Sequence, residues 1–470
     1  MNTFIRRRRK SNTIDMTVGS PFKNVVRFAL PFAFTTILQL LFNTVNMIVV
    51  GQFLGDTAFG SLGVTTPIIS VVVNLFTGIS AGVTVVIAKY FGAHKQKEIS
   101  ETVHSAVALS LVCGVILTLI GLFLSRTLLV ITNVSDEFMP YSETYLMLYL
   151  GGMIPFMLYN FGSSVLRGVG DTKRPLVFLS IGLGANLITS LLLVGVFDMG
   201  VAGAGIATIV AQLVSSTLTI ICLRKEHSAI RLLFNKVKFH KSKIGEILAT
   251  GVPMGVQSTM MALSNVFIQS AINSLGTQAA SGNAAASNWE SVAYAFIQGS
   301  YQGAVAFVAQ NVGAGNAKRV HRSALTFFGV GMGFGLVVGL LVWFLRDPLV
   351  SVYISDPVAK EYAFVRSLVM IPYFMVGYME ISACFTVGSG RAVYASVTNL
   401  VCLGVMRVLW VIFIFPIPEF HSLLGLYICY PITWVASGTV NLIFYFVFKK
   451  KITLQCEKNA ELIASAQGEL

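Results

Sequence analysis

The sequence predicts an all-α membrane protein with twelve transmembrane helices in two pseudo-symmetric six-helix bundles. Two observations carry this prediction: the chain is too apolar for a soluble protein, and its second half repeats the first. Charged residues make up 11% of the chain and the mean hydropathy is +0.76, whereas about 25% of a soluble domain is charged. The net charge of +13 therefore indicates basic loops beside a membrane rather than a nucleic-acid-binding surface.

The repeat is clearest in one apolar segment that occurs twice. Residues 82–97 have the sequence GVTVVIAKYFGAHKQK, and residues 303–318 have the sequence GAVAFVAQNVGAGNAK. Five positions recur 221 residues later: Gly82, Ala88, Gly92, Ala93 and Lys97 return as Gly303, Ala309, Gly313, Ala314 and Lys318. Within one residue, the same offset relates Pro31 to Pro253 and Gly168 to Gly388. The chain is therefore a duplication with two equivalent halves.

Twelve stretches are long enough to span a membrane, which takes about 20 apolar residues. They are residues 24–50, 61–88, 101–125, 141–166, 175–196, 202–223, 245–272, 283–312, 323–345, 362–387, 393–415 and 422–448. The chain then divides into a basic N-terminus (1–23), six spans (24–223), a basic linker (224–244), six spans (245–448) and a tail (449–470). An even number of spans in each half makes the halves parallel repeats, related by an axis along the membrane normal.

The distribution of Lys and Arg gives the expected orientation. Of the 33 basic residues, 28 fall in segments on the N-terminal side and 3 in loops on the other side, so both termini are expected in the cytoplasm of a plasma-membrane protein. The basic run at residues 6–10 lacks the short apolar region and cleavage site of a signal peptide, so we expect it to be retained. The six cysteines are scattered and indicate neither a disulfide framework nor a metal site.

Ionisable side chains at membrane depth are costly and usually face a cavity or a partner. Three lie well inside the predicted spans: Glu290, Glu380 and Arg407. Amides are the other candidates for a substrate cavity, although many serve only helix–helix hydrogen bonds: Asn43, Asn46, Asn160, Asn186, Gln257, Asn265, Gln269 and Asn288. Because proline kinks a helix, the recurrence of Pro31 and Pro253 in the first span of each half predicts paired hinges.

The depths of two of these charges match. Counted at about 1.5 Å per residue, Glu290 lies ~10 Å and Arg407 ~12 Å from the same membrane face. An unpaired charge at that depth would be costly. The sequence therefore predicts an ion pair between Glu290 and Arg407.

Gly78–Gly82 matches the G-x-S-x-G pattern of serine hydrolases, which works only on a strand-to-helix elbow. Here the pattern lies inside an apolar span, and all six histidines fall in loops or at span ends. An intramembrane protease is therefore disfavoured, and small residues for close helix packing are the better interpretation. The absence of a Walker A motif indicates that this chain does not hydrolyse ATP, so transport would be secondary.

Several strings resemble the multidrug and toxic compound extrusion (MATE) transporters, in particular their bacterial branch. They are LFNTVNMIVVGQFLG (41–55), LRGVGDTKRP (166–175), GVAGAGIAT (200–208), ASNWE and QNVGAG within 281–315, MEISACFTVGSG within 378–390 and YPITW (430–434). The resemblance runs from about Pro21 to Lys451. It implies a V-shaped pair of bundles around a central cavity. We expect a monomer that is not an enzyme and has no cofactor. The resemblance also implies export of organic, often cationic, drug-like compounds in exchange for H⁺ or Na⁺.

The sequence departs from this family where many members carry aspartates in the first and fifth spans. These positions are Asn46 and Ser190 here, and neither side chain supplies a negative charge. A buried carboxylate can bind a cation in one state and release it in another, because desolvation disfavours its charged form. We therefore expect the cation-coupling site in the second half, with Glu380 first and Glu290 second.

Two alternatives remain. A lipid-linked oligosaccharide flippase of a related fold usually has extra spans and several cationic side chains in its cavity. Twelve spans, with Arg407 as the one deeply placed cation, favour drug export instead. A receptor or scaffold that transports nothing would leave the two buried glutamates unexplained.

Overall fold

The computed structural model describes residues 13–132 and 134–468, and every regular element in these ranges is a helix. The first six spans form the N-lobe. Its helices are α1 (Pro21–Leu54), α2 (Asp56–Gly92), α3 (Gln96–Ile131), α4 (Met139–Gly151) followed by α5 (Met153–Gly168), α6 (Lys173–Ser190) with a π-helical end (Leu191–Val196), and α7 (Gly200–Lys225).

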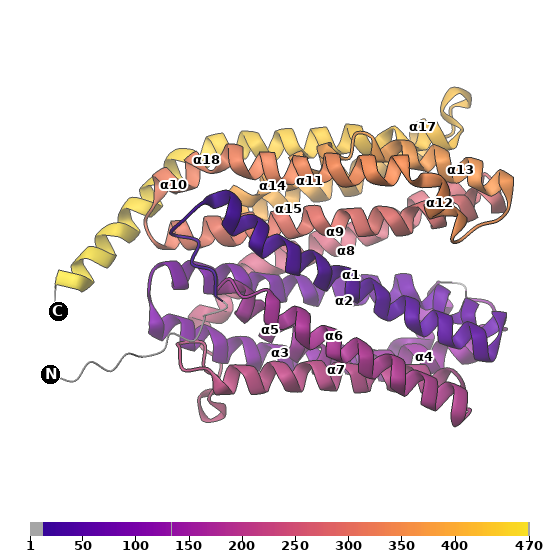
Figure 1. The fold of residues 1–470 in the computed structure, drawn as a ribbon, viewed down its shortest axis with the longest axis horizontal. Helices are drawn as coiled ribbons and strands as arrows, with labels where there is room; N and C mark the ends of the chain where they lie inside the picture. Colours follow the sequence, from indigo (N-terminus) through magenta and orange to yellow (C-terminus); the bar gives the residue numbers. More distant parts are fainter. Residues whose placement is uncertain (1–12, 133, 469–470) are drawn as a thin grey trace.

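The second six spans form the C-lobe. Its helices are α8 (Lys241–Asn273), α9 (Thr277–Gly313), α10 (Ala317–Arg322) with α11 (Ala324–Phe344) and α12 (Arg346–Ser351), α13 (Pro357–Ser367) with α14 (Phe374–Gly388), α15 (Ala392–Asn399) with α16 (Met406–Leu409), and α17 (Leu423–Tyr427) with α18 (Cys429–Gly468). Figure 1 shows the two lobes as two layers of roughly parallel helices, with both chain ends at the same end of the molecule. We call this end the terminal end. The predicted pair of six-helix bundles is confirmed.

Hydropathy alone identifies fewer than twelve spans. Eight helical stretches of the described chain are long and apolar enough to cross a membrane, and α13 with α14, bent by 44°, makes a ninth. The other three predicted spans are α4 with α5, α8 and α9. Helices α8 and α9 are 33 and 37 residues long, but they carry amides and a carboxylate that line internal cavities. Their polarity follows from the cavity that they enclose.

The predicted linker and the predicted tail differ in secondary structure. Between Lys225 and Lys241 the chain forms only a short 3₁₀ turn, Phe234–Lys236. The predicted tail, 449–470, instead continues α18 as one helix to Gly468, which projects beyond the bundle in Figure 1. This extension is held to the C-lobe, since the side-chain amide of Asn459 donates a hydrogen bond to the carbonyl of Val312 at 2.8 Å.

The lobes meet along α2 and α8 through glycines. A Cβ atom added at Gly78 would overlap the backbone of Gly255, and one added at Gly82 would overlap the backbone of Gly251. Only glycine allows the helix backbones to approach this closely, as is common for helix pairs in membranes. The G-x-S-x-G segment is therefore part of a packing surface, in agreement with its interpretation from the sequence.

This contact gives a direct prediction for stability. Gly255→Ala is expected to force α2 and α8 apart and to cost about 1–3 kcal/mol, as overpacking does. Gly245→Ala on the same helix is the matched control, because a Cβ there meets no atom within 4 Å and both variants gain the same helix propensity. The thermal midpoint in detergent should fall for Gly255→Ala alone. Equal midpoints would show that the interface adapts freely.

Candidate functional site

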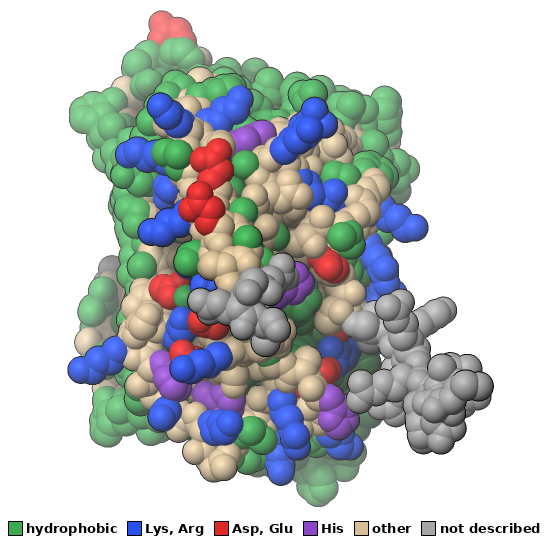
Figure 2. Space-filling view, turned by 90° about the vertical axis from the view of Figure 1, so that its left-hand side faces the viewer, with side chains coloured by type: hydrophobic (Ala, Val, Ile, Leu, Met, Phe, Trp, Pro, Cys, Tyr) green, Lys and Arg blue, Asp and Glu red, His purple; other side chains and the backbone are tan. Residues whose placement is uncertain are grey.

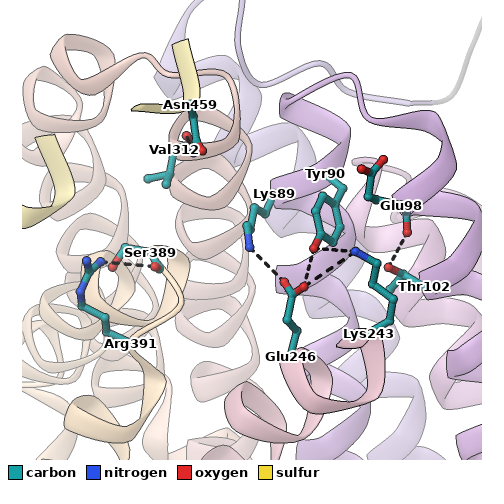
Figure 3. Close-up of polar contacts among 10 residues, drawn as sticks. All are labelled: Lys89, Tyr90, Glu98, Thr102, Lys243, Glu246, Val312, Ser389, Arg391 and Asn459. Atoms are coloured by element: carbon teal, nitrogen blue, oxygen red, sulfur yellow. Dashed lines mark hydrogen bonds and ion pairs between the residues drawn. The ribbon is translucent and has the colours of Figure 1, made fainter. Parts of the chain in front are cut away.

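An ionic cluster ties the two lobes together at the terminal end (Figure 3). Lys89 Nζ on α2 lies 3.0 Å from Glu246 Oε2 on α8. The Tyr90 hydroxyl donates a hydrogen bond to the other oxygen of Glu246, and Lys243 Nζ donates one to Tyr90 Oη at 2.8 Å. Lys89 and Tyr90 belong to the N-lobe and the other two residues to the C-lobe, so separating the lobes at this end breaks these contacts.

The segment that precedes α1 lies at the same end. The backbone N–H of Met16 donates a hydrogen bond to Gln310 Oε1 at 2.9 Å, and Gln310 Nε2 donates one to the carbonyl of Gly168 at 3.1 Å. Arg319 Nη2 donates to the carbonyl of Gly19 at 2.8 Å. Met16 is fully buried. Gln310 of the C-lobe therefore binds this segment and the end of the N-lobe helix α5 at once, and these contacts add to those that hold the lobes together at the terminal end.

Removing one charge should loosen this closure. Lys89 and Glu246 are partly exposed, so their pair contributes about 0.2–1 kcal/mol. Glu246→Gln is therefore expected to raise access to the cavity from the terminal end by about 2–5-fold. Access is measured as the labelling rate of Ser80→Cys by an impermeant maleimide, in a background without the six native cysteines. Glu457→Gln, an exposed change at the same end, is the control. Equal rates in both variants would exclude a closing role for the cluster.

Beyond these contacts, a cavity of about 440 Å³ lies between the lobes. We call it the central cavity. Its polar lining comes from both lobes: Gln39, Asn43, Asn46, Asn74, Asn160 and Arg167 from the N-lobe, and Gln257, Tyr294, Gln298, Gln302 and Glu380 from the C-lobe. A second cavity of about 520 Å³, the C-lobe cavity, adjoins it and shares Thr36, Leu40, Met261, Tyr294 and Gln298 with it. The two cavities are therefore adjacent and are separated by these shared side chains.

Glu380 is the carboxylate of the central cavity. It lies on α14, is 6% exposed, and its Oε1 accepts a hydrogen bond from the Tyr294 hydroxyl at 2.7 Å. Among the described residues that line this cavity, no other carries a carboxyl group. Arg167, on α5, is the cation in the same lining and lies over the ring of Phe32, 4.7 Å from its centroid. The cavity thus holds one charge of each sign.

The amides predicted from the sequence separate into three groups. Asn43, Asn46, Asn160 and Gln257 line the central cavity, and Asn265 and Gln269 line the C-lobe cavity. Asn186 is fully buried and Asn288 lines a separate pocket near Asp356, so these two border neither cavity. Asn46, at the position of a family aspartate, donates a hydrogen bond to Thr208 Oγ1 at 2.8 Å.

The predicted ion pair between Glu290 and Arg407 is wrong, because Glu290 has a different partner. Glu290 pairs with Arg366 of α13, and both side chains are largely buried. The depths of Glu290 and Arg407 fix only one coordinate. Helix α13 packs against α9, which carries Glu290, whereas the α16 helix of Arg407 packs against α8 and α18. Arg407 instead donates a hydrogen bond from Nε to Thr433 Oγ1 at 3.3 Å.

Sequence reasoning therefore missed two cavity arginines, Arg167 and Arg366. Arg167 lies one residue beyond the predicted span 141–166, and Arg366 lies near the start of the predicted span 362–387. Arg407 is not the one deeply placed cation, because all three arginines line the cavities. One argument against a flippase is thereby removed, while the number of spans still disfavours it. Both arginines lie about one helical turn or less from the end of a predicted span, and this position could have marked them as candidates for the cavity lining.

Comparison with known proteins shows what the chain is similar to. The MatE family model matches residues 31–192 and 253–412. A relative in Bacillus subtilis, named "Probable multidrug resistance protein YpnP", is 27% identical over 84% of this chain and 88% of its own length. A Shewanella oneidensis protein named "FAD transporter" is 24% identical over 82% of this chain and 86% of its own.

Among solved structures, a MOP superfamily transporter from Pyrococcus furiosus superimposes with a TM-score of 0.84. It is 20% identical, and the match covers 93% of this chain and 98% of that one, so this likeness concerns the fold. The family model falls on both halves of the duplication, on either side of the linker, and its two matched segments begin at Pro31 and Pro253. The chain therefore belongs to the MatE family of multi-pass membrane transporters, and it is a transporter and not an enzyme.

Proposed function

We propose that this protein is a secondary active multidrug exporter, which moves organic compounds out of the cell in exchange for H⁺ or Na⁺ by alternating access. The observation that carries the proposal is Glu380, a buried carboxylate in the cavity between the lobes whose described partner is the neutral hydroxyl of Tyr294. An uncompensated carboxylate in a low-dielectric cavity is stabilised by a bound proton or cation. It is therefore suited to carry the coupling ion.

Glu290 is the weaker candidate for coupling. Arg366 already neutralises its charge, and the Tyr373 hydroxyl donates a hydrogen bond to its backbone carbonyl at 3.3 Å. A carboxylate held in a buried ion pair exchanges a coupling ion only when that pair breaks. The pair supports a structural role for Glu290, which leaves coupling to Glu380.

The distribution of charge supports an orientation with both termini in the cytoplasm. Figure 2 shows the terminal end face on, with Lys and Arg side chains spread across both lobes. Positive loops face the cytoplasm in membrane proteins. With that orientation, the ionic cluster closes the cytoplasmic side, and the cavities lie toward the outer side of a bacterial plasma membrane. The arrangement fits the outward-facing half of a transport cycle.

The paired prolines fit a hinge role in this cycle. Pro31 and Pro253 lie inside α1 and α8, and the Thr35 hydroxyl donates a hydrogen bond to the Pro31 carbonyl at 2.8 Å. Pro31→Ala is expected to leave folding intact and to slow turnover several-fold, because hinge residues set the rate of conformational steps. Pro67→Ala, within α2 and without a counterpart in the repeat, is the control. Unchanged turnover of Pro31→Ala in proteoliposomes would remove the hinge role.

The proposal is tested in proteoliposomes with the cationic dye tetramethylrhodamine methyl ester as substrate. The Na⁺ and H⁺ gradients are imposed separately, and dye movement is followed by fluorescence. We expect dye transport under at least one of the two gradients, and the effective gradient identifies the coupling ion. Absence of gradient-driven movement in both cases, with protein shown to be inserted and folded, would overturn the proposal.

The substrates are expected to be small organic molecules of more than one charge type. One similar protein is named for multidrug resistance and another for transport of FAD, an aromatic molecule that carries phosphates. The central cavity offers both a carboxylate and a guanidinium beside aromatic rings. These contacts support a substrate range that extends beyond cations.

A further inference from the structure

The C-lobe cavity holds a positive charge for which the transport cycle gives no role. Two arginines and one glutamate line it: Arg366, Arg407 and Glu290. The ion pair between Glu290 and Arg366 neutralises one guanidinium. Arg407 is only 4% exposed, and within the described chain no carboxylate lies within 4.0 Å of it. The cavity therefore carries one buried cation in excess.

The geometry keeps this cation at the cavity wall. The guanidinium carbon of Arg407 lies 4.4 Å from the centroid of the Tyr430 ring, and that of Arg366 lies 4.5 Å from the same centroid. The two guanidinium carbons are therefore at most about 9 Å apart, and both guanidinium groups contact the Tyr430 ring. Glu290 is paired with Arg366 and not with Arg407. Among the residues that the structure describes, the Arg407 guanidinium meets one ring and one hydroxyl, and such a buried cation is costly in a membrane unless a further partner arrives.

An anion is the partner that fits. A guanidinium presents a planar fork of donors that binds a carboxylate through two parallel hydrogen bonds, and the described hydrogen bond of Arg407 to Thr433 occupies only Nε. Tyr430 and Trp434 line the cavity beside it, with their ring centroids 5.8 Å apart. A carboxylate attached to an aromatic ring would meet both kinds of surface.

We propose that the C-lobe cavity is a binding subsite for the carboxylate of aromatic anions and zwitterions, with Arg407 as the residue that binds the carboxylate. This inference rests on the proposed export function and names a substrate class for it. Tyr294 links the two compartments, because it lines both cavities and donates a hydrogen bond to Glu380. A zwitterion thus has a carboxylate partner for its cationic end and a guanidinium partner for its anionic end.

The test uses two dyes that differ only in one carboxylate. Tetramethylrhodamine has a free carboxyl group, and in tetramethylrhodamine methyl ester that group is blocked. Their affinities for the full-length protein in detergent are measured by fluorescence anisotropy, and the readout is the ratio of the two Kd values. We expect the wild-type protein to prefer the free acid by about tenfold or more, as for a hydrogen bond to a charged group.

Arg407→Gln should bring this ratio close to one, and Arg407→Lys should give an intermediate ratio because it keeps the charge but loses the fork. Lys360→Gln removes a cation that borders neither cavity and should keep the wild-type ratio. A wild-type ratio near one, or an Arg407→Gln ratio equal to that of the wild type, would overturn the proposal. If Arg407→Gln fails to fold, the wild-type ratio and the Arg407→Lys variant still decide.

Competition identifies the source of the anion. Benzoate should displace the free acid from wild-type protein at lower concentration than inorganic phosphate or short-chain phosphatidylglycerol does. Stronger displacement by the phosphatidylglycerol would assign the site to a lipid headgroup and overturn the proposal. Because these measurements need no gradient, a failure of this inference is distinct from a failure of export, which is tested with the ester in proteoliposomes.

Discussion

Glu380→Gln is expected to abolish gradient-driven export while leaving the protein folded in the membrane. Glutamine keeps the size of the side chain and still offers an oxygen to the Tyr294 hydroxyl, which lies 2.7 Å from Glu380 Oε1. It supplies no negative charge, so it neither takes up a proton nor attracts Na⁺. Accumulation of the ester dye against its gradient should fall to the level of empty liposomes.

The matched control is Glu290→Gln, because Glu290 is the other carboxylate among the described residues that line the two cavities. Its loss should lower stability more than it alters the dependence of export on the gradient. The affinity of the ester dye in detergent, measured for both variants, separates loss of coupling from loss of binding. Export by Glu380→Gln at the wild-type rate under the same gradient would place the coupling site elsewhere.

Arg366→Gln is expected to lower the free energy of unfolding by about 3–5 kcal/mol, because removal of one partner of a buried ion pair leaves an uncompensated charge. The pair between Arg366 and Glu290 is suited to this comparison, since the two side chains are only 6% and 17% exposed. Glu290→Gln should have a loss of similar size. The measurement is the thermal midpoint and the resistance to denaturant in a mild detergent.

The double variant Glu290→Gln with Arg366→Gln should lose much less than the sum of the single losses, because neither charge is then left alone. Arg407→Gln is the control for position, as it removes a buried guanidinium that has no carboxylate partner in the described chain. Its midpoint should be close to that of the wild-type protein or above it. Additive losses in the double variant would contradict the ion pair.

The architecture could be predicted because it depends on features that are read directly along the sequence. Apolar length, the recurrence at an offset of 221 residues and the bias of basic residues each depend on sequence position alone. Helices α8 and α9 are less apolar, and the repeat supports the spans predicted there, since their first-half counterparts α1 and α2 are strongly apolar. The extension of α18 was missed because a polar helix beyond the membrane leaves no apolar period.

The residues that line the cavities could not be predicted in full, because they depend on how the helices pack and rotate in three dimensions. Depth along a helix gives one coordinate of Glu290, whereas its partner is decided by which helix packs against α9. Helix rotation likewise separated Asn186 and Asn288 from the amides that line the cavities. A sequence with no fixed rotation for each helix does not distinguish an amide that faces a cavity from one that faces a neighbouring helix.

The segment before α1 limits how far the molecule can open. Met16 is fastened to Gln310 and Asn311 of the C-lobe, while α1 begins only five positions later, at Pro21 of the N-lobe. Five residues reach at most about 18 Å when fully extended. This short segment therefore limits the separation of the lobes at the terminal end as long as Met16 stays bound. A wider opening requires Met16 to leave Gln310 and Asn311, so the short segment between Met16 and Pro21 limits the distance that the lobes can move apart.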